Sequence, residues 1–403
     1  MTLFDRHLMA DPVAAYARLR EATAVHRTST PDGQPVWVIT RYAEARAALA
    51  DARFSLDKAN ARVEGDYQSS MPPELDAHLL NMDPPDHTRV RRLVAKAFTP
   101  RHIKSLADGI RATAAGLVAA GQGVRMDVME SLAVPLPMHV ICELLGIPER
   151  DRHDFRTWTD TLLSPAPDAA ADSRTAMRQM HQFLAAVIRD KRRHPAEDLL
   201  SMLTHARDER EALTERELLS LAFLMLFAGY DNAVHLIGNT VLALLLHPRL
   251  MDDVRQGALP LRAVVEETLR WNPPFPLGVR RFALEDVAVG GTVIPAGGRV
   301  WVSLASANRD GRRFPSPDAF DPNRLPAHLA FGHGFHHCLG APLARLEAEI
   351  AVTALLGRFP VMELAVPADE LSWLPSFHKR GLRSLPIRSS GGFRRGSYAN
   401  RTD

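Results

Sequence analysis

The pattern of apolar and polar positions along the chain is mainly helical. Apolar residues recur with amphipathic-helix spacing in three clear runs: Pro12–Glu21, Ala43–Ala50 and Asp172–Lys191. Strand-like stretches are few, namely Val36–Thr40 and the glycine-separated runs Asp286–Ile294 and Gly298–Leu304, which resemble a small antiparallel sheet. We therefore predict a mainly α fold with a small β-rich lobe.

The longest predicted helix runs from Glu215 to His247 and is ended by Pro248. At about 1.5 Å per residue it would be about 50 Å long, enough to cross the molecule. Four polar residues interrupt its apolar sequence before the ~20 residues that a membrane span needs: Asp231, Asn232, His235 and Asn239. We expect a buried central helix, and no membrane.

Composition adds limits on the function. The chain has 403 residues, 46% of them hydrophobic, so it can bury a large core. Its 49 basic and 47 acidic side chains leave a net charge of +2, without the basic excess typical of nucleic-acid binding. The first residues lack an apolar signal segment, which predicts a cytoplasmic protein. We expect one domain over residues 1–388 and a flexible Gly-, Ser- and Arg-rich tail over residues 389–403.

The segment Ala330–Gly340 carries the most informative chemistry, because it combines Cys338 with several glycines just before a predicted helix that starts near Pro342. At a helix N-terminus, free N–H groups favour a thiolate. A plain core cysteine would not need the glycines, and no hydrolase pattern surrounds a cysteine nucleophile. Zinc ligands packed this tightly would not easily close a tetrahedron: His333, His336, His337 and Cys338. Thiolate ligation of haem iron suits the loop best.

The spacing of this loop resembles the haem-binding loop of the cytochrome P450 family. The matching residues are Phe331, Gly332, Gly334, His336, Cys338, Leu339 and Gly340. The resemblance implies the cytochrome P450 fold, with haem b (iron protoporphyrin IX) between the long central helix and the cysteine loop with its following helix. It makes Cys338 the iron ligand and places Phe331, Gly332 and Gly340 against the haem.

Five other regions resemble the same family, in the family's order. Glu267 and Arg270 match its Glu-x-x-Arg pair, which implies a structural lock beneath the haem, although exposed pairs at this spacing are common. Many members carry Arg at the position of Ala319, and that Arg joins the pair. We expect either that Arg324 takes over this contact or that the lock is looser.

By the same resemblance, the haem propionates would be bound by His87, Arg91, Arg281 and His336. His87 and Arg91 lie one helical turn apart, so both side chains can donate to carboxylates from one face. The alternative is a basic solvated face, because Arg89 and Arg92 are also present.

The segment Ala228–Asn232 resembles the family's oxygen-activation motif. Ala228 and Gly229 would let the helix pass close over the iron, and Asp231 would deliver protons with the raised pKa of an unpaired buried acid. The alternative is an Asp231 paired with an Arg elsewhere in the chain. Asn232 departs from the family's usual Thr; its amide can orient a water or the substrate but cannot place a hydroxyl at the same point.

The resemblance also implies an apolar substrate pocket, lined from the loop Met71–Met82 and by Leu224, Phe227, Leu277, Val279 and Phe377. For Leu224 and Phe227 ordinary helix core is an equally good interpretation. His378 and Tyr230 would supply polar contacts to the substrate or face solvent.

The function implied is a monooxygenase that oxidises a small apolar organic natural product with O2. Its electrons would come from a separate ferredoxin or flavodoxin, with Arg101 or Arg345 binding the acidic partner. Asn232 motivates a second possibility, oxidative coupling without oxygen insertion. A haem-binding sensor is a third, but a sensor would not need Asp231 on the distal helix.

Overall fold

The computed structural model describes residues 12–30, 33–61, 73–121, 124–163, 170–205, 213–325 and 327–389. It is 58% helical, which confirms the predicted mainly α class. The helices are α2 (Pro12–Ala22), α3 (Tyr42–Ala50), α4 (Pro73–Asp76), α5 (Asp86–Ala95), α6 (Pro100–Ala120), α7 (Pro135–Leu145), α8 (Arg152–Leu163), α9 (Ala170–Arg193), α10 (Leu199–His205), α11 (Glu215–Gly229), α12 (Asp231–Leu246), α13 (Pro248–Arg255), α14 (Leu261–Trp271), α15 (Leu304–Ala307) and α16 (Ala341–Arg358). The predicted tail, residues 389–403, lies outside the described residues except for Ser389.

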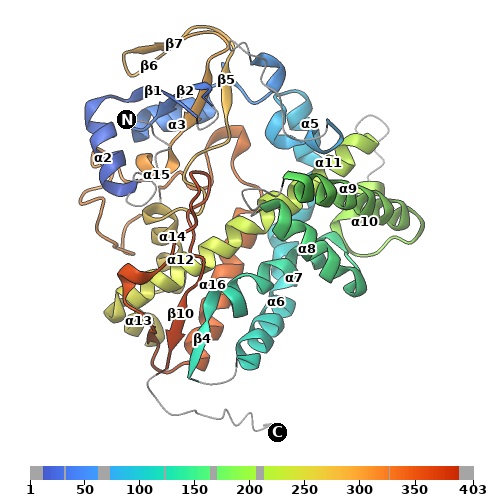
Figure 1. Ribbon diagram of the computed structural model, residues 1–403, viewed down its shortest axis with the longest axis vertical. Coiled ribbons are helices and arrows are strands. Elements are labelled where there is room, and N and C mark those ends of the chain that lie inside the picture. Colours follow the sequence, from blue (N-terminus) through green and yellow to red (C-terminus); the bar gives the residue numbers. More distant parts are fainter. Residues whose placement is uncertain are drawn as a thin grey trace.

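The strands gather mainly in one lobe beside the helices (Figure 1). A five-stranded sheet has the order β1 (Val25–Ser29), β2 (Pro35–Ile39), β8 (Arg299–Val302), β5 (Arg281–Ala283) and β3 (Phe54–Ser55), and only its β2–β8 pair is parallel. Two smaller sheets are antiparallel: β4 (Arg125–Asp127), β10 (Pro386–Arg388) and β9 (Glu363–Leu364), and the hairpin of β6 (Val287–Val289) and β7 (Thr292–Ile294).

The predicted small antiparallel sheet is therefore half right. Residues 286–294 do form the hairpin β6–β7, but β8 leaves it and joins the larger sheet between β2 and β5. One of its two partners, β2, lies about 260 residues earlier in the chain, and local alternation of side chains carries no information on such a distant partner.

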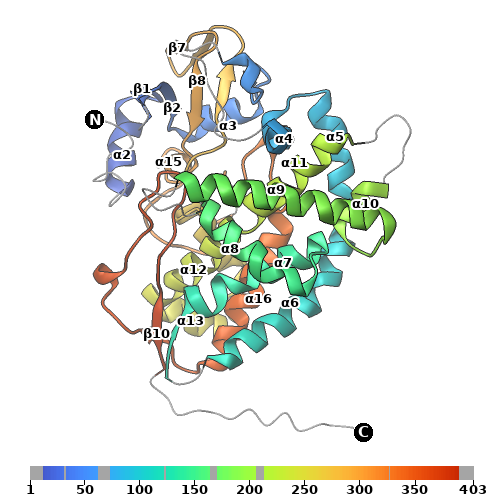
Figure 2. The same ribbon diagram turned by 45° about the vertical axis from the view of Figure 1, so that its right-hand side comes forward.

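Helix α12 crosses the middle of the helical region, where α14 and α16 pack against it (Figures 1 and 2). The stretch Glu215–Leu246 is long and apolar enough to span a membrane by length and composition alone, but 67% of its most apolar window is buried inside the protein, as in the core helix of a soluble protein. Its start is well defined, because Thr214 and Glu217 form a reciprocal capping box.

The prediction of one continuous helix from Glu215 to His247 is wrong at Tyr230, where α11 ends and α12 begins. The carbonyl of Tyr230 accepts from the N–H groups of Ala233 and Val234, each at 3.1 Å, so a new helical start forms there. The carbonyl of Ala228 accepts from the side-chain Nδ2 of Asn232 at 3.3 Å. A side chain that competes for a backbone carbonyl is a known cause of helix distortion.

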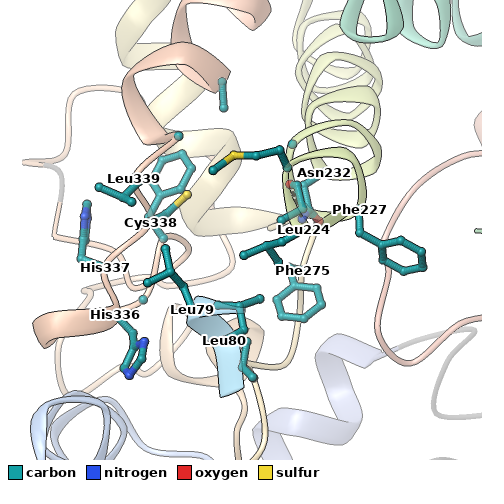
Figure 3. A pocket seen from close by; sticks show the side chains of 18 of the residues that line it. Leu79, Leu80, Leu224, Phe227, Asn232, Phe275, His336, His337, Cys338 and Leu339 are labelled. Atoms are coloured by element: carbon teal, nitrogen blue, oxygen red, sulfur yellow. Dashed lines mark hydrogen bonds between the residues drawn. The ribbon is translucent and has the colours of Figure 1, made fainter. Parts of the chain in front are cut away.

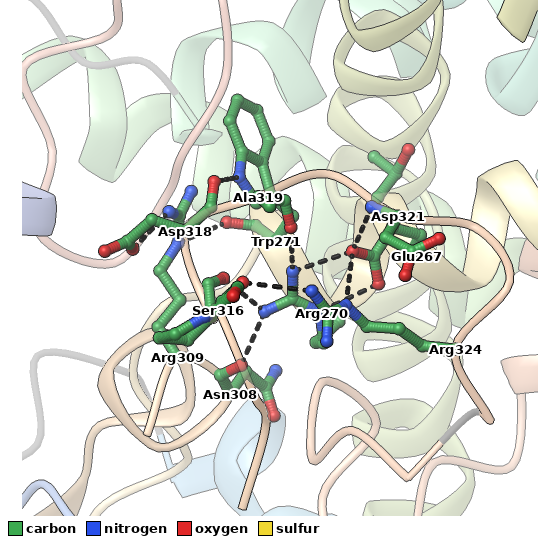
Figure 4. Close-up of polar contacts among 12 residues, drawn as sticks. Glu267, Arg270, Trp271, Asn308, Arg309, Ser316, Asp318, Ala319, Asp321 and Arg324 are labelled. Atoms are coloured by element: carbon green, nitrogen blue, oxygen red, sulfur yellow. Dashed lines mark hydrogen bonds and ion pairs between the residues drawn. The ribbon is translucent and has the colours of Figure 1, made fainter. Parts of the chain in front are cut away.

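The Glu267–Arg270 pair on α14 forms a buried lock that joins three parts of the chain (Figure 4). Arg270 donates to Glu267 Oε2 through Nε at 2.8 Å and to Oε1 at 2.7 Å. Its remaining donors reach three main-chain carbonyls, those of Asn308, Pro317 and Ala319, at 3.0, 2.8 and 2.9 Å. Because every donor direction is used, the guanidinium is well compensated in spite of burial.

Arg324 approaches the same carboxylate, with its Nε 3.5 Å from Glu267 Oε1. It also donates to the carbonyls of Pro315 and Ser316, at 2.6 and 2.9 Å. The departure at Ala319 therefore does not leave Glu267 without a second cation: Arg324 supplies it from five residues further along the chain.

We predict that Arg270→Met strongly destabilises the fold. The change leaves the buried Glu267 carboxylate with the Asp321 N–H at 2.8 Å and, as its remaining cation, Arg324 at 3.5 Å. Loss of one partner from a buried pair costs about 3–5 kcal/mol. The free energy of unfolding in urea measures this. The control Arg53→Met removes an exposed partner of Asp51 and should change stability little. Equal effects of the two substitutions would contradict the lock.

Candidate active site

A cavity of about 710 Å³ lies between the α11–α12 junction and the loop that carries Cys338. Cys338 and Leu339 form one side, and Leu224 and Asn232 project from the helix on the other (Figure 3). The lining is mostly apolar. An enclosed apolar space with few polar groups is typical of a small-molecule site.

The cysteine loop is closed by its own backbone. The N–H of Cys338 donates to the carbonyl of Phe331 at 2.9 Å. Gly332 and Gly334 have φ values of +73° and +74°, which disfavour any residue with a side chain. At Gly334 an added Cβ would also lie only 3.0 Å from the Cα of Ala50 on α3. These two positions explain why the loop needs glycine.

The Cys338 thiol sits just before α16, whose first turn contains Pro342. The residue is exposed, and the surface it exposes lines the cavity. Burial within the protein raises the pKa of this thiol, although N–H groups of Gly340 and Ala341 and the charges of Arg91 and Arg345 favour the thiolate. The N–H groups at the helix start thus favour the thiolate, as expected from the sequence, but they do not outweigh desolvation. A metal cation bound to the sulfur would supply the missing stabilisation.

One end of the cavity gathers four nitrogen-bearing side chains, and all four come from the set predicted from sequence. They are His87 and Arg91 on α5, Arg281 on β5 and His336 in the cysteine loop. The rings of His87 and His336 lie 4.0 Å apart, centroid to centroid. Both ring nitrogens of the buried His87 and the Nε2 of His336 have no hydrogen-bond partner in the described part of the chain.

Burial of this cluster disfavours positive charge. Desolvation lowers the pKa of His87 to about 4, and desolvation together with His87 and Arg281 lowers that of His336 to about 3. Burial likewise lowers the pKa of Arg281 to about 10. The unpartnered imidazole nitrogens of His87 and His336 and the neighbouring guanidinium groups of Arg91 and Arg281 would be stabilised by an anion bound between them.

The cluster fits the two carboxylates of a haem whose iron is bound by Cys338. The competing interpretation, a basic solvated face on α5, does not hold for Arg89, which pairs with the buried Glu217 on α11. The face of α5 with His87 and Arg91 borders the cavity, whereas the intervening Arg89 points to another helix. The residues present thus fit the group that the family resemblance implies.

The oxygen-side motif is divided by the helix junction. Ala228, Gly229 and Asn232 line the cavity, but Asp231 does not. Its Oδ2 lies 2.9 Å from Lys379 Nζ, and its Oδ1 lies 3.5 Å from His235 Nε2. Burial opposes ionisation, yet His235 and Lys379 outweigh it and lower the pKa of Asp231. The expected raised pKa is therefore wrong. Asp231 is paired, as in the alternative, but its partners are Lys379 and His235 and not an Arg.

Three of the five predicted pocket residues line the cavity: Leu224, Phe227 and Val279. Leu277 and Phe377 do not. Leu277 is buried in a separate cluster with Trp301, and Phe377 packs on the Trp301 ring at 5.8 Å between centroids. Leu277 forms an isolated antiparallel bridge with Ser303.

Of the two residues expected to offer polar contacts to the substrate, His378 lines the cavity and Tyr230 does not. His378 lines the cavity, with its pKa lowered to about 4 by burial and by Arg299 and Lys379. Tyr230 is buried instead, with its hydroxyl 3.5 Å from Asp160 Oδ1, and burial raises its pKa. The predicted lining loop begins at Met71, which with Pro72 lies outside the described residues, whereas Leu79 and Leu80 line the cavity as expected.

Sequence reasoning missed a polar cluster in the cavity wall. Asp76 pairs with Lys58 and accepts from Asn81 Nδ2 at 2.8 Å, and Arg280 donates to Asn81 Oδ1 at 2.6 Å. Asp76 and Asn81 lie in the lining loop predicted from sequence, but Lys58 and Arg280 come from segments far from it, so no local motif could have indicated the cluster.

Glu347 on α16 is a second residue that the motifs did not indicate. It lines the cavity and is 2% exposed, and its Oε2 has no hydrogen-bond partner in the described part of the chain. Burial raises its pKa to about 8, so it is protonated at neutral pH. An acidic residue within an otherwise apolar helix face was the available signal.

The two basic residues expected to bind an acidic partner differ. Arg101 is exposed. Arg345 pairs with Glu266, which also contacts His328 at 3.1 Å, and its guanidinium lies 4.6 Å from the Phe331 ring centroid. Arg345 therefore serves the packing around the cysteine loop, and its charge is already compensated.

A mainly helical fold with a cysteine loop facing a largely apolar cavity is the arrangement expected of a haem-thiolate oxidoreductase. The family model of cytochrome P450 matches residues 139–377. The chain belongs to the cytochrome P450 family and is a monooxygenase.

Individual relatives are similar over nearly the whole chain. The cytochrome P450 monooxygenase PikC of Streptomyces venezuelae is 47% identical over 398 residues, covering 97% of this chain and 93% of PikC. The P450 monooxygenase TamI bound to tirandamycin C is 41% identical with a TM-score of 0.87, covering 95% of this chain and 98% of TamI. The bacillaene polyketide synthase cytochrome P450 PksS of Bacillus subtilis 168 is 38% identical with a TM-score of 0.90, covering 97% and 100%.

We predict that Glu347→Gln changes the pH dependence of stability. Glu347 has its pKa raised to about 8 in the folded protein against about 4.5 when unfolded, so the unfolded chain loses this proton first as pH rises. Its contribution is fully present below the unfolded pKa and is lost towards pH 8, by about 1.4 kcal/mol per pH unit. Wild type should therefore lose stability relative to Glu347→Gln between about pH 5 and pH 8.

The measurement is the free energy of unfolding in urea at several pH values. The exposed Glu370→Gln serves as the control and should run parallel to wild type. A difference between wild type and Glu347→Gln that stays constant over this range would show that Glu347 is already ionised in the folded protein.

Proposed function

We propose that the chain binds haem b with Cys338 as the iron ligand and oxidises an apolar polyketide-type natural product. The observation that carries the proposal is the convergence on one cavity of the Cys338 thiol and the orphaned imidazoles of His87 and His336. In this proposal the propionates accept from His87, His336, Arg91 and Arg281. Phe331, Gly332 and Gly340, which all line the cavity, contact the macrocycle.

When bound, haem supplies the activation of O2, and a thiolate ligand favours O–O cleavage. The protein's own residues do the rest. Leu79, Leu80 and Phe275 form apolar walls that exclude water and orient the substrate. Ala228 and Gly229 keep the helix surface free of large side chains at the junction. The side-chain amide of Asn232 donates a hydrogen bond to the Ala228 carbonyl, and Asn232 also lines the cavity.

The substrate class rests on the cavity and on the relatives. The walls are chiefly apolar, and the cluster of Asp76, Asn81, Lys58 and Arg280 offers hydrogen bonds at one side. An apolar body with a few oxygen functions suits such a site. Two solved structures have the same fold: TamI, which is described as bound to tirandamycin C, and PksS, which is named as a cytochrome P450 of the bacillaene polyketide synthase. We place the protein in the cytoplasm, in secondary metabolism.

Electrons come, in this proposal, from a separate ferredoxin or flavodoxin with its reductase. The exposed Arg101 near the start of α6 supports an acidic partner through charge complementarity. Arg345 is not part of this surface, because Glu266 compensates it.

A second candidate is oxidative coupling of two substrate positions without oxygen insertion. Asn232 favours it, since its amide is engaged with the Ala228 carbonyl at 3.3 Å and cannot offer a hydroxyl to the reacting oxygen. Product masses separate the two: a gain of oxygen indicates insertion, and a loss of two hydrogens indicates coupling.

The first test is the absorption spectrum of the reduced, carbon-monoxide-bound protein. Wild type should show the red-shifted Soret band of thiolate-ligated haem, and Cys338→Ser should lose it. Cys142→Ala removes the other cysteine, which is buried in the core, and should keep the band. A wild-type spectrum typical of histidine-ligated haem, or no haem at all, would refute the assignment.

We also predict that Asn232→Thr alters the fate of reduced oxygen. A hydroxyl in place of the amide changes proton delivery, so the ratio of product to hydrogen peroxide should shift several-fold. The matched control is Asn81→Thr, at the polar side of the cavity, where substrate affinity rather than peroxide yield should change. Unchanged product and peroxide yields in Asn232→Thr would remove Asn232 from proton delivery.

A further inference from the structure

A largely buried ion pair joins α14 to α16 beside the cysteine loop. Glu266 on α14 accepts from Arg345 on α16 through both carboxylate oxygens, from one terminal guanidinium nitrogen at 2.9 Å and from Nε. The two side chains are only 13% and 21% exposed. The neighbouring Glu267 belongs to the lock and contacts other cations. Solvent screens charges poorly in such a place, so this pair acts on groups beyond its own contacts.

His328 ties the same carboxylate to the start of the cysteine loop. Its Nε2 lies 3.1 Å from Glu266 Oε2, and its Nδ1 accepts from the N–H of Ala330 at 3.2 Å. A ring nitrogen that accepts carries no proton, so the proton of His328 is on Nε2 and the ring is neutral. We call Glu266, Arg345 and His328 the loop clasp. The loop clasp thus contains one cation and one anion.

The cation of the loop clasp lies against the cysteine loop. The guanidinium carbon of Arg345 is 4.6 Å from the centroid of the Phe331 ring. Phe331 lines the cavity, and its carbonyl accepts from the Cys338 N–H at 2.9 Å. The charge of Arg345 favours the thiolate of Cys338, and burial together with this charge lowers the pKa of His337. Arg345 therefore acts electrostatically on the loop that carries the iron ligand.

The anion of the loop clasp is fully charged at neutral pH. Burial opposes ionisation of Glu266, but the hydrogen bonds from His328 and Arg345 outweigh it and lower its pKa to about 2. Arg91 also favours the thiolate and donates to the His337 carbonyl at 2.6 Å, but in the proposed function it binds a propionate. Arg345 has a carboxylate of its own instead. Glu266 thus determines how much of the Arg345 charge acts at Cys338.

We propose that Glu266 is a positioning residue that sets the reduction potential of the haem–thiolate centre, by holding Arg345 against Phe331 and cancelling part of its charge at Cys338. The inference rests on the proposed function. The step concerned is the transfer of one electron from the donor protein to the ferric iron, which becomes ferrous; no bond forms or breaks. A nearby cation stabilises the added negative charge and raises the potential, whereas a nearby carboxylate lowers it.

Neutralising each partner should shift the potential in opposite directions. Glu266→Gln keeps the size of the side chain but leaves Arg345 without its carboxylate, so the potential of the holoenzyme should become more positive. Arg345→Gln leaves the Glu266 charge with His328 as its partner, so the potential should become more negative. The double variant Glu266→Gln with Arg345→Gln has neither charge and should lie close to wild type. A spectroelectrochemical titration measures all of them.

Two further variants separate charge from packing. Arg345→Lys keeps the cation and should keep the potential near the wild-type value. Asp198→Asn is the matched control, because it leaves Lys191 without its carboxylate in a pair whose side chains are 12% and 5% exposed, outside the cavity lining. Its potential should equal that of wild type.

A second measurement reports on the sulfur and needs no turnover. In the reduced, carbon-monoxide-bound protein, a thiolate that donates less electron density leaves the C–O bond stronger. The C–O stretching frequency should therefore rise in Glu266→Gln and fall in Arg345→Gln. If Glu266→Gln folds poorly, Arg345→Gln and Arg345→Lys still test the proposal in both measurements.

The possible outcomes distinguish the proposal from a purely structural role. Potentials that are the same in Glu266→Gln, Arg345→Gln and wild type would overturn it. A shift of the same sign in both single variants would also overturn it, because a loosened cysteine loop would then explain the effect. A wild-type spectrum without thiolate-ligated haem refutes the proposed function itself. A thiolate spectrum with unmoved potentials refutes only the role of Glu266.

Discussion

The site depends on a concentration of buried nitrogen donors at one end of an apolar cavity. His87, Arg91, Arg281 and His336 come from α5, β5 and the cysteine loop, and the protein brings them together at an electrostatic cost that appears as lowered pKa values. Such an arrangement persists only where packing elsewhere enforces it. The buried Glu267–Arg270 lock, the glycine contact of the cysteine loop with α3 and the packing of α12 on α16 provide that enforcement.

The same constraint explains two of the carboxylic acids at or near the cavity, Asp231 and Glu347. Asp231 has cationic partners and stays ionised, while Glu347 has none in the described part of the chain and keeps its proton. The difference arises from neighbours and not from depth alone, because both carboxyl groups are largely buried. The protein thus holds one charged and one neutral acid at the edges of a single apolar cavity.

The sequence predicts the ends of some helices closely but not the partners of distant segments. Amphipathic spacing placed α2, α3 and α9 within two residues of their observed ends, because each of these helices buries one face. It did not reveal the break at Tyr230, because helical spacing resumes after the polar Asp231 and Asn232; at the break the Asn232 side chain donates to the Ala228 carbonyl. Nor did it place β8, whose partners β2 and β5 are chosen by the sheet as a whole.

By itself the sequence determined the helical class, the cysteine loop, the four nitrogen donors and the family, because these depend on residue identity at short spacing or on motifs in a known order. Only the tertiary structure decided that Asp231 is paired with Lys379, that Arg324 completes the lock, that Leu277 and Phe377 face away from the cavity, and that Glu347 is neutral. Each of these rests on contacts or burial between residues distant in the chain. Charge state and facing direction are properties of an environment, and the environment exists only once the chain is folded.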